Sequence, residues 1–200
     1  VVFLIGVDLI DVKGMQSIFA QRRSEFWVAL ITALMVVFVG VEQGIILAIV
    51  LSLIDHTRRG YRPKNVVLVP AESGVLRAQP VASKAQAIPG LLIYRFTHSM
   101  YYANSEQLSQ EITDLINQAE PPVRWFCLDA SAVDDVDYSA AETLRSLFGI
   151  LKEKGIRLVV AQVLDDVRET SRYRLRELYG EDAFYDTLDD VVQDYRKQTG

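Results

Sequence analysis

The sequence has 200 residues and a net charge of −5, from 26 acidic and 21 basic side chains. This charge argues against a nucleic-acid-binding protein, because neutralising phosphates requires a concentrated positive surface. The only cysteine, Cys127, excludes a disulfide framework, and two histidines argue against a histidine-based metal centre. Half of the residues are nevertheless hydrophobic, so apolar residues must be concentrated in part of the chain.

Charge divides the chain into two parts. Residues 1–64 carry seven basic and five acidic side chains, whereas residues 65–200 carry 14 basic and 21 acidic ones. Such asymmetry predicts two different environments. We therefore expect two domains, one over residues 1–64 and the other over residues 65–200.

The first part is typical of a membrane segment. Between residues 26 and 54 only Glu42 is ionisable. The run predicts two apolar helices, over 26–40 and 43–54, joined by a turn of Glu42, Gln43 and Gly44. Each is shorter than the roughly 20 residues that cross a bilayer alone. A membrane hairpin is favoured over a soluble helical hairpin, since residues 1–64 have too few polar side chains to cover both helices.

The segments next to the hairpin and its turn give three further predictions. Residues 1–10 form a third apolar segment, which begins without Met or a basic stretch and is read as the tail of a longer helix rather than a signal peptide. Glu42 is either a functional acid at membrane depth or a solvated turn residue. Basic residues on both sides place both hairpin ends in the cytoplasm: Lys13, Arg22 and Arg23 before it, and Arg58, Arg59, Arg62 and Lys64 after it.

The second part is typical of a small α/β domain. Short apolar runs alternate with longer amphipathic ones, which predicts a sheet covered by crossover helices. We expect core strands over 66–69, 91–96, 123–128 and 156–161, with a weak strand near 75–78. Helices are expected from Asn104 or Ser105 to about 119, and over 140–154, 165–179 and 186–196. The third carries a basic face of Arg168, Arg172, Arg174 and Arg176, which forms a basic patch with Lys197.

A loop rich in aspartates joins the 123–128 strand to the next helix. Ser139 and Glu142 fit a capping box, in which the hydroxyl accepts from a first-turn N–H and the acid reaches back. The functional alternative is that Ser139 is phosphorylated, because added negative charge is favourable at a helix start. The loop also holds Asp129, Ser131, Asp134, Asp135 and Asp137.

Neither catalysis nor a dedicated metal site is expected at this loop. Its four aspartates would bind Mg²⁺ only weakly, through oxygen ligands alone. No phosphate-binding loop, nucleophile elbow, paired-cysteine motif or zinc-protease motif accompanies them. We therefore expect no enzyme activity, no cofactor and no resident metal.

Three stretches of the sequence carry recognisable motifs. The first is GVEQGI at residues 40–45. The second is PGLLIYRF at 89–96, followed by YYANSE at 101–106. The third is Asp129-x-Ser131 with Asp137-x-Ser139-Ala140. In this order the motifs resemble one family, the SulP inorganic anion transporters with a carboxyl-terminal STAS domain. The first is similar to the turn between the last two membrane helices of these transporters, and the third to the STAS signature loop. The resemblance covers essentially the whole chain.

The resemblance implies an α/β STAS domain, a mixed β-sheet with crossover helices, preceded by α-helical transmembrane segments. Ser139 matches a phosphoacceptor position of related anti-sigma factor antagonists, although Tyr138 and Ala140 depart from that pattern. The implied whole protein is a secondary active transporter of sulfate or bicarbonate class, multi-pass in the inner (plasma) membrane, with its STAS domain in the cytoplasm. Its implied partners are the lipid bilayer, a second copy in a homodimer, a cytoplasmic regulatory protein, and an inorganic anion bound by upstream helices.

Two functional interpretations remain open at the level of sequence. One is the carboxyl-terminal part of an anion transporter, whose STAS domain regulates transport and assembly. The other is a membrane-tethered STAS switch that binds proteins under phosphorylation control and transports nothing. The residues do not distinguish sulfate, bicarbonate and dicarboxylates as substrates.

Overall fold

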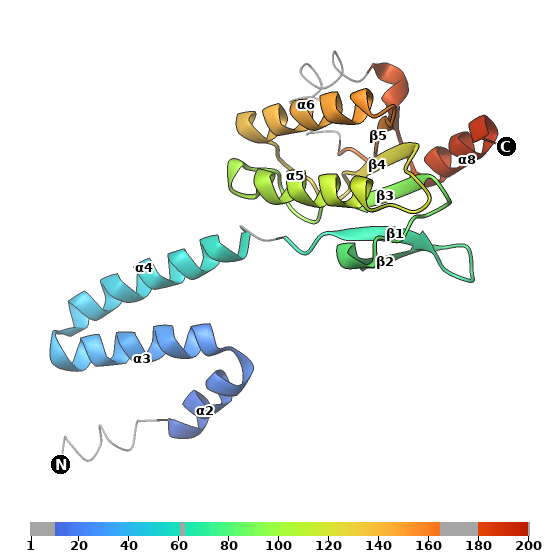
Figure 1. The fold of residues 1–200 in the computed structure, drawn as a ribbon. Helices are drawn as coiled ribbons and strands as arrows, with labels where there is room; N and C mark the ends of the chain where they lie inside the picture. The colour runs from blue at the N-terminus through green and yellow to red at the C-terminus, as the bar shows by residue number, and fades with distance from the viewer. Residues whose placement is uncertain (1–10, 61–62, 165–179, 200) are drawn as a thin grey trace. The chain divides into compact units, whose positions relative to one another are not determined.

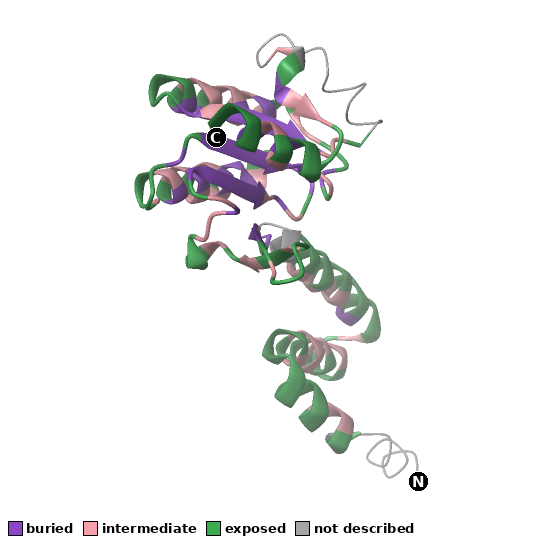
Figure 2. Cartoon of the chain, turned by 90° about the vertical axis from the view of Figure 1, so that its right-hand side faces the viewer, coloured by how far each residue is buried: buried purple, intermediate pink, exposed green. Residues whose placement is uncertain are grey.

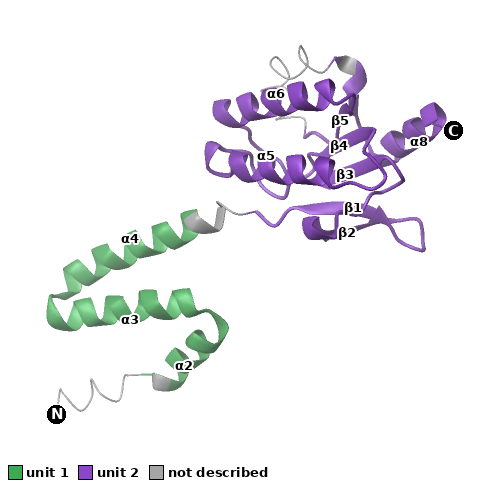
Figure 3. Cartoon of the chain, viewed as in Figure 1, with its two compact units in different colours: residues 1–59 green, residues 60–200 purple. Residues whose placement is uncertain are grey.

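The computed structural model describes residues 11–60, 63–164 and 180–199 (Figure 1). The chain forms two compact units, residues 1–59 and 60–200 (Figure 3). The apolar segment predicted at 1–10 lies outside the described residues. So does the helix predicted at 165–179, together with its basic face.

The described residues of unit 1 form three helices: α2 (Val12–Gln21), α3 (Arg23–Phe38) and α4 (Val41–Gly60). Asp11 caps α2 by accepting a 2.8 Å hydrogen bond from the Gly14 N–H. In the part of the chain that the structure describes, we find no helix that has both the length and the apolar character needed to cross a bilayer. Most apolar side chains of α3 and α4 are exposed in this chain. The helices of unit 1 accordingly carry mainly the green of exposed residues in Figure 2.

The reversal between α3 and α4 lies earlier than the sequence predicts. Glu42, Gln43 and Gly44 were expected to form the turn, but all three belong to the start of α4. The chain reverses at Val39 and Gly40 instead. Gly40 allows this because it adopts φ +149°, a backbone conformation that residues with a Cβ rarely adopt. Gly44 is buried, and a Cβ there would come within 2.3 Å of the Val36 side chain, so it serves close helix packing.

Unit 2 is built on one six-stranded sheet in the order β2-β1-β3-β4-β5-β6. Its strands β3, β4, β5 and β6 run parallel, whereas β1 is antiparallel to both β2 and β3. The strands are β1 (Val66–Pro70), β2 (Leu76–Pro80), β3 (Leu91–Arg95), β4 (Trp125–Asp129), β5 (Arg157–Ala161) and β6 (Phe184–Tyr185). The mixed sheet expected from the sequence is confirmed.

Within residues 63–164 and 180–199, three helices cover the two faces of this sheet (Figure 1). Helices α5 (Tyr102–Asn117) and α6 (Tyr138–Glu153) lie side by side on one face, and α8 (Leu188–Thr199) covers the other. Alternate residues of β3 divide accordingly: Leu92 and Tyr94 join the core under α5 and α6, while Leu91 and Ile93 join the core under α8. The loops after the carboxyl ends of β3 and β4 lead into α5 and α6.

Candidate functional site

The starts of α5 and α6 meet at the carboxyl edge of the sheet, and Asp137 joins them. Asp137 is the N-cap of α6, where its Oδ1 accepts a 2.7 Å hydrogen bond from the Ala140 N–H. Its Oδ2 accepts a 2.8 Å hydrogen bond from the Tyr102 N–H, in the first turn of α5. One carboxylate thus satisfies a free N–H of two helices and places negative charge at both positive helix ends.

The loops before these helices are also bound to each other. The Met100 N–H donates to the Asp135 carbonyl at 2.9 Å, and the Asp137 N–H donates to the Met100 carbonyl at 3.0 Å. The Ser99 hydroxyl donates to Asp134. Asn104, which is buried, accepts from the Tyr101 N–H and donates to the Ser99 carbonyl. We call this pair of loops, residues 97–104 and 129–139, the paired loops.

A buried ion pair lies at the base of the paired loops. Asp129, the last residue of β4, is 0% exposed, and its Oδ2 accepts a 2.6 Å hydrogen bond from Arg95 Nε. Its Oδ1 accepts from the Ser131 N–H at 3.0 Å, which bends the chain away from the strand. The Asp129 carboxylate and the Ser131 N–H therefore shape the start of this loop.

The capping box predicted at Ser139 is wrong. The helix begins at Tyr138, one residue before Ser139, and Asp137 provides the cap. Glu142 forms an ion pair with Arg145 at 2.9 Å instead of reaching back. Asp137 prevails because its carboxylate also binds the N–H of Tyr102 at the start of α5. The Ser139 hydroxyl, half-buried in the first turn, makes no hydrogen bond with the residues that the structure describes.

The aspartates of the paired loops do not converge. Among the described residues, no three acidic, histidine or cysteine side chains are placed to hold a metal ion. Each carboxylate has its own partner: Arg95 for Asp129, Ser99 for Asp134, the Val136 N–H for Asp135, and the two helix starts for Asp137. The arrangement suits a protein-facing surface, and exposed aromatic side chains border it at Tyr101, Tyr102 and Tyr138.

The sequence identifies the aspartate loop but not its partner loop. Nothing in the pattern around Ser99 and Met100 signals that this segment bonds to residues 134–137. The available local signal is Asp137 itself, because Asp three residues before Ala140 fits an N-cap as well as Ser139 does.

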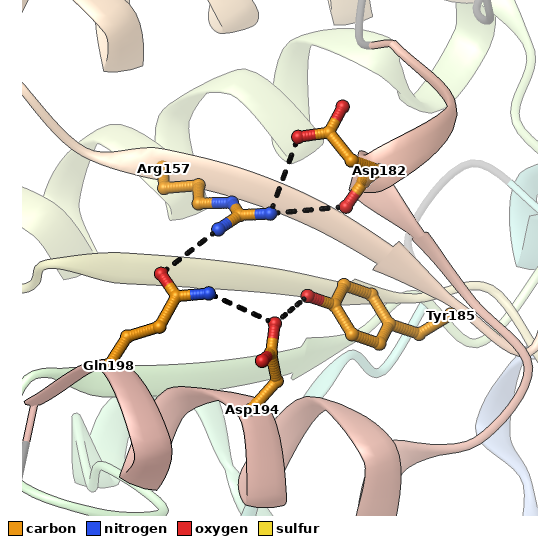
Figure 4. A network of polar contacts seen from close by, with 5 residues as sticks. All are labelled: Arg157, Asp182, Tyr185, Asp194 and Gln198. Carbon is orange, nitrogen blue, oxygen red and sulfur yellow. Dashed lines mark hydrogen bonds and ion pairs between the residues drawn. The ribbon is translucent and has the colours of Figure 1, made fainter.

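A second polar network lies away from the paired loops, between β5, β6 and α8 (Figure 4). Arg157 donates to Gln198 at 3.2 Å and to the Asp182 carbonyl at 3.1 Å, and its guanidinium lies over the Trp125 ring. The Tyr185 hydroxyl donates to Asp194 at 2.6 Å, and Gln198 donates to the same carboxylate. This network fastens α8 to the sheet.

The contribution of this network to stability should fall at alkaline pH. Burial, followed by the hydrogen bond to Asp194, raises the pKa of Tyr185 to about 12. Because the pKa is about 10 in the unfolded chain, this contribution is complete below that pH and is lost as the pH rises toward 12. The variant Tyr185→Phe should therefore lose stability less steeply over this range in urea unfolding. Tyr94 and Cys127, whose pKa values burial also raises, titrate alike in both proteins. Parallel curves for the two proteins would contradict the assignment.

Comparison with known proteins extends these observations. The family model of the STAS domain matches residues 82–191. A probable sulfate transporter of Mycobacterium tuberculosis is 32% identical over 196 residues, which cover 96% of this chain and 35% of the relative. High affinity sulfate transporter 2 of Stylosanthes hamata is 27% identical over 207 residues, covering 96% and 31%. The chain thus spans about a third of the length of these relatives.

Solved structures show the same fold. The murine Slc26a9 anion transporter, solved in the inward-facing state, matches with a TM-score of 0.77 at 17% identity. The match covers 97% of this chain and 32% of that chain.

Proposed function

This chain belongs to the STAS-domain family and is homologous to the carboxyl-terminal portions of SulP sulfate transporters, and from this premise we propose that its unit 2 regulates anion transport. The regulation acts through binding, with the paired loops as the surface that receives the signal. The observation that carries the proposal is Asp137, which joins the starts of α5 and α6 two residues before a hydroxyl with no partner among the described residues. A change of charge at Ser139 would act directly on that junction.

We propose that residues 1–64 are the last transmembrane helices of the transporter and that residues 65–200 are its cytoplasmic STAS domain. The exposed apolar side chains of α3 and α4 support this assignment, because so many of them on two neighbouring helices require lipid or further protein to cover them. In this arrangement Glu42, Gln43 and Gly44 open the last membrane helix. The whole protein acts as a homodimer, and upstream helices bind the anion.

The substrate class is proposed from the relatives, which are named sulfate transporters. Uptake of labelled sulfate and of labelled bicarbonate by cells that express the intact protein tests this assignment. We expect saturable uptake of one of the two anions. If neither anion were taken up although the protein is present in the membrane, the membrane-tethered switch would be favoured. No specific observation supports that alternative.

The regulatory role of Ser139 predicts a selective effect on transport. In the intact transporter, Ser139→Asp should change the rate of anion uptake severalfold while leaving the preference between anions unchanged, because negative charge beside Asp137 weakens the junction of α5 and α6 but lies in a different unit from the proposed membrane helices. The matched control is Ser146→Asp, since Ser146 is exposed on the same helix two turns later.

Uptake rates and competition between anions in proteoliposomes measure both variants. An altered anion preference in Ser139→Asp, or an equal change of rate in Ser146→Asp, would contradict the assignment of the paired loops.

A further inference from the structure

The segment that leads into unit 2 is held by a set of buried polar contacts. Asn65 is 6% exposed, and its Nδ2 donates to Glu111 Oε2 at 2.9 Å. Its Oδ1 accepts from the Thr97 N–H at 3.1 Å. Two residues earlier, the Pro63 carbonyl accepts a 2.9 Å hydrogen bond from Gln107 Nε2. We call residues 63–65 the entry segment; both α5 and the loop after β3 hold it.

Glu111 is the centre of these contacts. Its Oε2 also accepts from the Tyr94 hydroxyl at 2.7 Å, and its Oε1 accepts from Gln107 Nε2 at 2.6 Å. Tyr94 is fully buried, and burial, followed by the negative charge of Glu111, raises its pKa, so the phenol remains a donor at physiological pH. The carboxylate is therefore satisfied by three donors, each of which also fixes a different part of the unit.

The same two elements reach the paired loops. At the start of α5 the Tyr102 N–H donates to Asp137, and Gln107 and Glu111 follow about one and a half and two and a half turns later on that helix. Thr97, which bonds to Asn65, lies two residues before Ser99, which bonds to Asp134. Two continuous routes of covalent and hydrogen bonds thus connect the aspartate loop to the entry segment, entirely within unit 2.

We propose that α5 and residues 97–104 couple the paired loops to the entry segment, so that loosening the Asp137 junction releases residues 63–65. The segment has two states: held, with Asn65 bonded to Glu111 and Thr97, and released, with these groups in water. Because water replaces the lost hydrogen bonds, such a local opening needs only part of the free energy of global unfolding. The regulatory meaning of this coupling rests on the function proposed above, since helices α2, α3 and α4 precede the entry segment in the chain.

Hydrogen exchange of the intact transporter in detergent, followed by mass spectrometry, tests the coupling. Asp137→Asn replaces one carboxylate oxygen by an NH2 group. A single acceptor oxygen then remains for the N–H groups of Tyr102 and Ala140. Amides of residues 65–69 should then exchange severalfold faster. The matched control is Asp194→Asn, which weakens the network of Figure 4 at the far edge of the sheet and should leave residues 65–69 unchanged. Ser99→Ala is a milder second variant, which removes only the bond to Asp134.

The coupling is overturned if Asp137→Asn or Ser99→Ala speeds exchange at residues 100–104 while residues 65–69 keep their protection. It must also be reciprocal, since a coupling free energy acts equally in both directions. Asn65→Ala should therefore speed exchange at residues 100–104, and unchanged protection there would refute the coupling as well.

The two proposals fail separately. Faster exchange at residues 65–69 in Asp137→Asn, with no effect of Ser139→Asp on transport, supports the coupling and overturns regulation at Ser139. Altered transport in Ser139→Asp, with residues 65–69 equally protected in Asp137→Asn and Ser99→Ala, overturns the coupling alone.

Discussion

Replacing Asp129 by alanine is expected to lower the free energy of unfolding of unit 2 by about 3 kcal/mol, because removal of one partner leaves the other charge of a buried ion pair uncompensated. Asp129 is fully buried, whereas the Arg95 side chain is 33% exposed, so solvent reduces the loss to the lower end of the usual range. The Ser131 N–H loses its acceptor as well.

Urea unfolding monitored by tryptophan fluorescence measures this loss. In a Trp27→Phe background Trp125, which is buried in β4, reports on unit 2 alone. The matched control is Asp182→Ala, whose carboxylate lies 3.5 Å from Arg157 and is 83% exposed. Exposed pairs contribute little, so the control should lose less than about 1 kcal/mol. Equal losses in the two variants would mean that the Arg95 pair does not act as a buried one.

The second large effect is expected at Asp137. Asp137→Ala should destabilise unit 2 by about 2 kcal/mol, since loss of an N-cap alone costs roughly 1 kcal/mol and a second N–H, on Tyr102, loses its charged acceptor. The matched control is Ser139→Ala, which should change the free energy of unfolding by only about a few tenths of a kcal/mol, because the half-buried hydroxyl makes no hydrogen bond with the described residues.

The same fluorescence measurement applies to both variants. If Ser139→Ala proved the more destabilising of the two, the hydroxyl and not the carboxylate would be the cap of α6. If Asp137→Ala were no worse than loss of one cap, the bond to Tyr102 would contribute nothing to stability.

The sequence predicts the central sheet well because its strands are buried on both faces. The runs at β3, β4 and β5 are almost continuously apolar, which is typical of parallel strands covered by helices. The edge strand β6 is not predicted, since its two residues pair only with β5 and carry no pattern of their own. The position of the α3–α4 reversal is missed for a related reason: apolar residues continue through Gly40, and only its backbone conformation marks the turn.

The candidate site is predicted in part. Its aspartates are visible in the sequence, but their roles depend on contacts between segments far apart in the chain. Ser139 and Asp137 are both acceptable caps locally, and the choice follows from Tyr102, which lies 35 residues earlier. In the same way, nothing near Asn65 signals that it bonds to Glu111, 46 residues later.

The two edge strands of the sheet, β2 and β6, affect how this domain behaves at high concentration. At one end, β2 carries the exposed charge of Arg77 and finishes at Pro80, which has no N–H to offer an incoming strand. At the other end, β6 is only two residues long. Neither margin therefore offers a long flat template for cross-β stacking, so many copies can be concentrated in one place with little tendency to grow into fibrils.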